Sequence, residues 1–119
     1  MSDLAMVAVV SAYNLRFIRY WDAESRIVGD AGPKVTRPLP GVPGLHMFYD
    51  QSDVDAPHQD LNEVGRRVVE AFGHPRQDEM RGQLCIYLAD AEGAPVDMPP
   101  WLRDRIQEEV GRARADTRA

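Results

Sequence analysis

Cysteine is nearly absent from this sequence: Cys85 is the one thiol among 119 residues. A single thiol excludes an internal disulfide framework and a tetrahedral thiolate zinc site, because both need several cysteines. Cys85 lies between Leu84 and Ile86 in an apolar segment, and burial there favours an inert structural thiol over a nucleophile. We therefore expect a reducing, cytoplasmic location.

Long apolar runs are also missing. The longest apolar segment, residues 4–13, has about half of the roughly 20 residues that a membrane-spanning helix needs. No basic residue precedes this segment, as a secretory signal would require. The segment is therefore expected to belong to the folded protein, and no membrane association is predicted.

Positive charge is low: the chain has 14 Lys and Arg residues against 19 Asp and Glu residues, and its net charge is −5. Nucleic-acid binding depends largely on basic side chains that neutralise phosphates, so it is not expected here. Every Lys or Arg residue except Lys34 is arginine, and a GC-rich genome is favoured as the cause over a need for bidentate pairing, although composition alone does not separate the two. Arg66 and Arg67 alternate with Glu63 and Glu70, a spacing that predicts ion pairs along a helix.

Sequence motifs for known chemistry are absent. The chain has no GxSxG nucleophile turn, no GxxxxGK phosphate loop and no HExxH zinc motif. No catalytic, cofactor-binding or metal-ligating residue is therefore assigned from a motif. The densest polar segment is 50–60, whose four aspartates could supply oxygen ligands for a hard cation, although their order does not fit an EF-hand. The alternative interpretation is a solvated loop before a capped helix.

The composition, 44% hydrophobic and 28% charged, is that of a globular protein, and the length suits one core. We expect a single α+β domain over 1–119. Segments rich in β-branched and aromatic residues predict strands at 4–13, 15–21, 45–49 and 84–88. The first is apolar on both faces, as in a doubly covered strand, but its alanines leave a helix open as the alternative. Residues 26–28 are a possible extension of the sheet.

Proline and glycine gather in one place, residues 32–44, where four prolines and three glycines predict an extended loop. A helix is expected from about His58 to Phe72, with an apolar stripe at three- and four-residue steps, Asp55 as its cap and Gly73 at its end. A last helix is expected over 99–113, capped by Asp97, and residues 112–119 are expected to fray.

The predicted element order is therefore β-β-β-α-β-α. It indicates a sheet of about four strands, mixed or antiparallel, with two amphipathic helices on one face. Because a helix joins the strands 45–49 and 84–88, these two strands could form one right-handed parallel crossover.

The expected function is a non-enzymatic interaction or accessory protein, such as a subunit, an immunity-type inhibitor or an assembly component. Its partner would be another protein or a second copy of the chain. A surplus of large aromatic residues favours this hypothesis, because such residues mark interfaces: Tyr13, Tyr20, Trp21, Phe48 and Trp101. The alternative is a small enzyme or a ligand- or metal-binding domain that uses the polar region of His46, Asp50, Asp53, Asp55 and His58.

Overall fold

A computed structural model of the chain describes residues 4–28, 33–56, 59–75 and 80–117. Its strands are β1 (Met6–Val10), β2 (Leu15–Arg19), β3 (Lys34–Pro38), β4 (Leu45–Asp50), β5 (Leu84–Ala89) and β6 (Pro95–Val96). Its helices are α1 (Tyr20–Ile27), α2 (Gln51–Val54), α3 (Glu63–Ala71) and α4 (Pro100–Thr117). The predicted α+β class with an antiparallel sheet is confirmed, but the structure has more strands and helices than expected.

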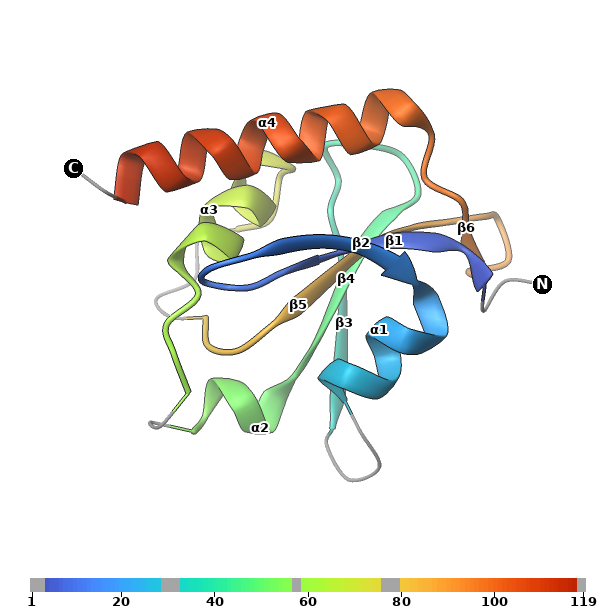
Figure 1. Ribbon diagram of the computed structural model, residues 1–119. Helices are drawn as coiled ribbons and strands as arrows, with labels where there is room; N and C mark the ends of the chain where they lie inside the picture. Colours follow the sequence, from blue (N-terminus) through green and yellow to red (C-terminus); the bar gives the residue numbers. More distant parts are fainter. Residues whose placement is uncertain (1–3, 29–32, 57–58, 76–79, 118–119) are drawn as a thin grey trace.

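The strands form one sheet in the order β2-β1-β5-β4-β3, and β6 pairs with the far end of β5 (Figure 1). Every pairing is antiparallel. In the middle of the sheet Cys85 on β5 lies between Val9 on β1 and Phe48 on β4. The parallel crossover predicted for β4 and β5 is therefore wrong, since these two strands are antiparallel neighbours.

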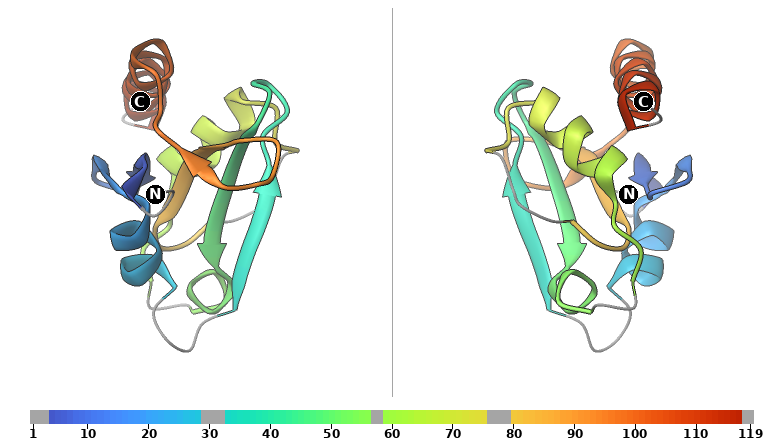
Figure 2. Two further views of the ribbon diagram at one scale, coloured as in Figure 1. Left: turned by 90° about the vertical axis from the view of Figure 1, so that its right-hand side faces the viewer. Right: turned by 90° about the vertical axis from the view of Figure 1, so that its left-hand side faces the viewer.

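Helices cover both faces of the sheet (Figure 2). One face carries α3 and α4, whose apolar side chains join those of the sheet in the larger core, and Phe72, Leu102 and Ile106 are fully buried there. The other face carries α1 in a smaller core. Strand β1 contributes Ala8 and Val10 to the first core and Val7 and Val9 to the second, which explains why it is apolar throughout.

The helix α1 was not predicted. The strand pattern was expected to run to Trp21, but β2 ends at Arg19 and the helix begins at the next residue. Tyr20, Ala23 and Ile27 follow one another at three- and four-residue spacing and are the buried residues of this helix. Residues 26–28 consequently do not extend the sheet. The two predicted helices, α3 and α4, contribute to the same core, and the prediction missed both α1 in the opposite core and the short helix α2.

A strand also occupies part of the segment that was predicted to be a loop. β3 pairs with β4 along its whole length, from Lys34 opposite Asp50 to Pro38 opposite His46. Proline is tolerated because β3 is an edge strand, where a missing backbone donor costs little. The loop prediction for 32–44 is therefore wrong between Lys34 and Pro38.

Helix α3 begins later than predicted, at Glu63, and its cap is Asn62 rather than Asp55. Asn62 is fully buried, and its Oδ1 accepts a hydrogen bond from the backbone N–H of Gly65 at 2.9 Å. Its Nδ2 donates to the carbonyls of Val10 at 3.0 Å and Gly82 at 2.9 Å. This one side chain thus fixes α3 against β1 and against the segment that leads into β5.

Helix α4 is longer than predicted. It continues to Thr117, so residues 112–117 are helical rather than frayed, and Ala113 is buried in the larger core. Asp97 is not the N-cap of this helix, since the helix begins three residues later at Pro100, and its Oδ1 instead accepts from the backbone N–H of Met6 at 2.8 Å. No helix within the described ranges combines the length and the apolar character needed to cross a bilayer.

Candidate functional site

The aspartate-rich segment after β4 forms a tight local structure. Asp50 is 5% exposed, and its Oδ1 accepts from the backbone N–H of Ser52 at 2.8 Å and from the Ser52 hydroxyl at 2.5 Å. This contact caps α2. Asp55, at the end of the same short helix, accepts from Gln51 Nε2 at 3.3 Å. Both carboxylates therefore serve the turn that leads out of the sheet.

The residues proposed for a ligand or metal site are not gathered in one place. His46 and Asp50 lie at opposite ends of β4, about 13 Å apart at roughly 3.3 Å per residue. Asp53 accepts from Gln59 Nε2 at 3.3 Å, and His58 lies outside the described residues. Among the residues that the structure describes, no three His, Cys, Asp or Glu side chains are arranged to hold a metal ion.

The structure assembles a different polar cluster on the α1 side of the sheet. The ammonium group of Lys34, on β3, donates to Glu24 Oε2 at 2.6 Å and to the Tyr20 hydroxyl at 2.8 Å, both on α1. The same ammonium group lies 4.7 Å from the centre of the Phe48 ring and 5.3 Å from that of Tyr20. Lys34 thereby joins an edge strand to the helix through hydrogen bonds and cation–π contacts.

Neither the Lys34 amine nor the Tyr20 hydroxyl has a pKa that would make it a nucleophile at neutral pH. Burial acts to lower the pKa of Lys34, but its hydrogen bonds to Glu24 and Tyr20 outweigh burial and raise the pKa above its usual value. Burial raises the pKa of Tyr20, against the opposing effect of Lys34. The amine stays protonated and the phenol stays neutral, whereas a nucleophilic lysine requires a depressed pKa.

Aromatic rings extend this cluster. Tyr20 packs edge-on against Phe48 and Tyr87, with ring centres 5.6 and 5.4 Å apart. His46 stacks on Tyr87 at 5.6 Å, and its Nδ1 lies 2.9 Å from the carbonyl oxygen of Gly44. Burial raises the pKa of the neighbouring Cys85 thiol well above its usual value, which keeps the sulfur unreactive. The cluster is therefore built as a packed structural unit.

Sequence reasoning missed this cluster because it missed α1. Lys34 stands out in the sequence as the single lysine. With Tyr20 expected on a strand, however, the sequence indicates no hydrogen-bond partner for its ammonium group. The helical spacing of Tyr20, Ala23 and Ile27 was the available signal, since it puts Glu24 on the turn next to Tyr20.

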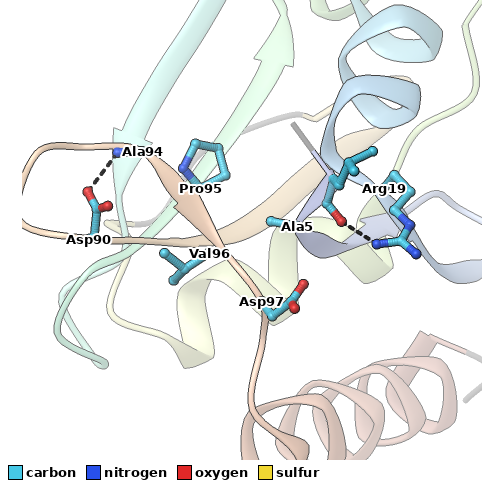
Figure 3. A pocket seen from close by; sticks show the side chains of 8 residues that line it. Ala5, Arg19, Asp90, Ala94, Pro95, Val96 and Asp97 are labelled. Carbon is cyan, nitrogen blue, oxygen red and sulfur yellow. Dashed lines mark hydrogen bonds between the residues drawn. The ribbon is translucent and has the colours of Figure 1, made fainter. Parts of the chain in front are cut away.

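One depression of the surface lies where β6 separates β1 from β5 (Figure 3). Leu88 on β5 pairs with Val96, so β1 pairs with β5 only from Ala8 onward. The resulting hollow has a volume of about 380 Å³ and is open to solvent. Its charged side chains hold the backbone, since Arg19 donates to the carbonyl of Leu4 at 2.6 Å and Asp97 accepts from Met6.

A second depression, between α3 and α4, is lined by ion pairs: Arg67 pairs with Asp116 at 3.6 Å and Arg112 pairs with Glu109 at 2.8 Å. Elsewhere on α3, Arg66 pairs with Glu63 and, at 3.0 Å, with Glu70. These contacts agree with the prediction that acids on the same helix neutralise the arginines of α3. Charges of both signs line this groove, so it does not present a basic surface to a polyanion.

Three large aromatic side chains remain exposed on the surface. Tyr13, in the turn between β1 and β2, is 75% exposed, and Trp21 at the start of α1 is 54% exposed. Trp101 in the first turn of α4 is 56% exposed. Of the aromatic residues expected to be in surplus, Tyr20 and Phe48 are buried in the core on the α1 side. Comparison of the chain with protein-family models, with curated proteins and with solved structures gives no match.

Proposed function

We propose that this protein is a non-enzymatic interaction or accessory protein that acts through surface contacts. The observation that carries the proposal is the exposure of Tyr13, Trp21 and Trp101, each more than half accessible to solvent. Tyrosine and tryptophan are the residues that most often dominate binding energy at protein interfaces. Their exposure in a chain with a well-filled core favours a role outside folding.

The polar groups support the same conclusion. The buried carboxylate of Asp50 caps a turn, Lys34 is held by Glu24 and Tyr20, and the Cys85 thiol is buried with a raised pKa. Each of these groups has a structural role that accounts for its position. A subunit, an immunity-type inhibitor or an assembly component, acting in the reducing environment of the cytoplasm, is the kind of protein that this arrangement suits.

Alanine substitution of the exposed aromatics tests this proposal. Tyr13→Ala, Trp21→Ala and Trp101→Ala are compared with wild type for self-association by sedimentation and for capture of partners from the host extract. At least one substitution is expected to weaken association about tenfold or more, as interface aromatics commonly do. Gln107→Ala, an exposed polar position on α4, is the matched control. A monomeric wild type that captures no protein in an aromatic-dependent manner would contradict the proposal.

A further inference from the structure

We propose that β2 is the contact strand of a symmetric dimer, pairing antiparallel with β2 of a second copy so that the two sheets become one. The inference rests on the proposed function and names the partner. It also names the register, with Phe17 opposite Phe17 of the other copy. Three features of the chain support it: a free strand edge, the direction of its backbone groups, and two exposed aromatics placed symmetrically around Phe17.

The strand β2 ends the sheet. It pairs with β1 along its whole length, and it has no strand on its other side among the described residues. In the two views of Figure 2 the β1–β2 hairpin lies at the outer margin of the molecule. Its side chains at Leu15, Phe17 and Ile18 are half-buried. An edge strand that lacks proline and carries apolar side chains between its charged ones is a template for pairing with another strand.

Hydrogen bonds at both ends of the hairpin fix which backbone groups point outward. The N–H of Ser11 donates to the carbonyl of Asn14 at 2.9 Å, and the N–H of Tyr20 donates to the carbonyl of Ala5 at 2.8 Å. Hydrogen-bonded and non-hydrogen-bonded pairs alternate along an antiparallel ladder. Arg16 and Ile18 therefore bond inward to β1.

The residues between them, Leu15, Phe17 and Arg19, direct their N–H and C=O groups away from β1. The N–H groups of all three residues and the C=O groups of Leu15 and Phe17 have no backbone partner among the described residues. The C=O of Arg19, the N-cap of α1, accepts the first hydrogen bond of that helix. The free groups recur at every second residue, as the second ladder of a continuing sheet requires.

One two-fold register suits these groups best. With Phe17 opposite itself, the Phe17 pair forms two hydrogen bonds, and the Arg19 N–H of each copy donates to the Leu15 carbonyl of the other copy, which gives four bonds. Arg16 then lies opposite Ile18, so no two arginines face each other directly. A register centred on Ile18 would form two bonds from free groups, and one centred on Arg16 would form four but would place two like charges opposite each other.

The exposed aromatics fit this register. Tyr13 and Trp21 each lie four residues from Phe17, on opposite sides of it. The symmetry axis therefore brings the β1–β2 turn of one copy to the start of α1 of the other, twice in the dimer. Tyr13 and Trp21 are 75% and 54% exposed in the single chain, and the dimer gives each of them an aromatic neighbour.

The opposite edge of the sheet lacks these features. β3 ends in Pro38, which has no N–H to donate, and proline is a usual device that keeps an edge strand from pairing. Both edges carry two basic side chains, Lys34 and Arg37 on β3 and Arg16 and Arg19 on β2, so proline is the feature that distinguishes them. The asymmetry between the two edges favours β2 as the strand that joins two copies.

The test variant, Arg19→Pro, and its control, Arg19→Ala, differ in one backbone hydrogen-bond donor. Arg19 has a φ of −70°, which proline adopts without strain, and its N–H points outward in the hairpin. Arg19→Pro removes that donor in both copies and keeps the inward ladder, whereas Arg19→Ala keeps the donor and loses the same side-chain bond to Leu4. Sedimentation equilibrium and circular dichroism are measured for both variants and for wild type.

Wild type and Arg19→Ala are expected to sediment at twice the 13.4 kDa of the chain. Arg19→Pro is expected to dimerise roughly 10- to 100-fold more weakly, because two interchain hydrogen bonds are lost. Tyr13→Ala and Trp21→Ala should weaken the dimer, and Trp101→Ala should not. If Arg19→Pro fails to fold, this comparison of the aromatic variants tests the β2 dimer in its place. A monomeric wild type at several hundred micromolar, or equal dimer strength in the proline and alanine variants, would overturn the inference.

The two proposals fail in different ways. If wild type is monomeric and yet captures another protein through Tyr13, Trp21 or Trp101, the dimer is wrong and the interaction role stands. If wild type neither self-associates nor captures a partner through these residues, both proposals are wrong.

Discussion

At the scale of single residues, buried Asn62 does the most to connect parts of the chain that are distant in sequence. It has no exposed surface, and its amide group contacts backbone atoms of Val10, Gly65 and Gly82. A buried polar side chain is tolerated only when its hydrogen bonds are made, and here three are made at 2.9–3.0 Å. The sequence pattern did not single out this residue, because its partners lie up to 52 positions away.

Asn62→Ala is expected to lower the free energy of unfolding by about 2–4 kcal/mol, since it leaves buried backbone groups without partners and opens a cavity. Urea denaturation monitored by circular dichroism measures the change. Asn14→Ala, which removes an exposed asparagine from the β1–β2 turn, is the control and should change stability by less than about 0.5 kcal/mol. Equal effects of the two substitutions would show that Asn62 is not a structural bridge.

At the scale of elements, some segments form because of their local sequence pattern and others because of contacts with distant parts of the chain. Helix α4 forms from residues with a clear apolar stripe, and Gly111 lies on its exposed side with open space around the missing side chain. The connection between β3 and β4 instead depends on contact with α3. There Gly41 donates its N–H to the carbonyl of Phe72 at 2.7 Å, and a Cβ on Gly41 would lie 2.7 Å from that oxygen.

Substituting these two glycines by alanine should therefore have opposite effects. Gly111→Ala is expected to raise the free energy of unfolding by about 0.5–1 kcal/mol, because glycine is a poor helix former. Gly41→Ala is expected to lower it by about 1–3 kcal/mol, because the connection must move off the end of α3. Thermal and urea unfolding give both values. A stabilising Gly41→Ala would mean that the close approach to Phe72 is not required.

At the scale of the whole molecule, Lys34 holds the β3 edge to α1 across the second face of the sheet. Its folded pKa is raised by the hydrogen bonds to Glu24 and Tyr20, so the interaction stabilises the folded state at pH values below the usual 10.5 of a lysine. That stabilisation is lost as pH rises through the folded pKa. Burial raises the pKa of Tyr20, so its ionisation opposes folding in the same alkaline range.

Lys34→Met tests this alkaline dependence. At neutral pH it should lower the free energy of unfolding by about 1 kcal/mol or less, because the ion pair with Glu24 is partly exposed, at 31% and 46%. The difference from wild type should shrink above about pH 10.5 as the ammonium group loses its proton. Urea denaturation across pH 7–11.5 measures the difference, and Lys34 contributes nothing through its charge if that difference stays constant.

The sequence by itself determined the strands β2, β4 and β5, the last two helices, and the α+β class, and it favoured a strand over a helix for β1. Each of these rests on a local pattern: β-branched runs for the strands and an apolar stripe at helical spacing for the helices. These patterns hold wherever the segment lies in the fold, because they reflect the preferences of neighbouring residues. For the same reason the burial of Cys85 could be predicted from its flanking residues.

Only the tertiary structure decided the pairing of the strands, the state of residues 20–27 and 34–38, and the grouping of polar side chains. Residues 20–27 combine strand-forming aromatics with the helical spacing of Tyr20, Ala23 and Ile27, and the need to cover the second face of the sheet decides between these two local signals. Residues 34–38 form a strand because β4 offers a partner, despite Pro38. The contacts of Asn62 and Lys34 likewise join distant segments. Such contacts depend on which surfaces meet, and no local pattern encodes that.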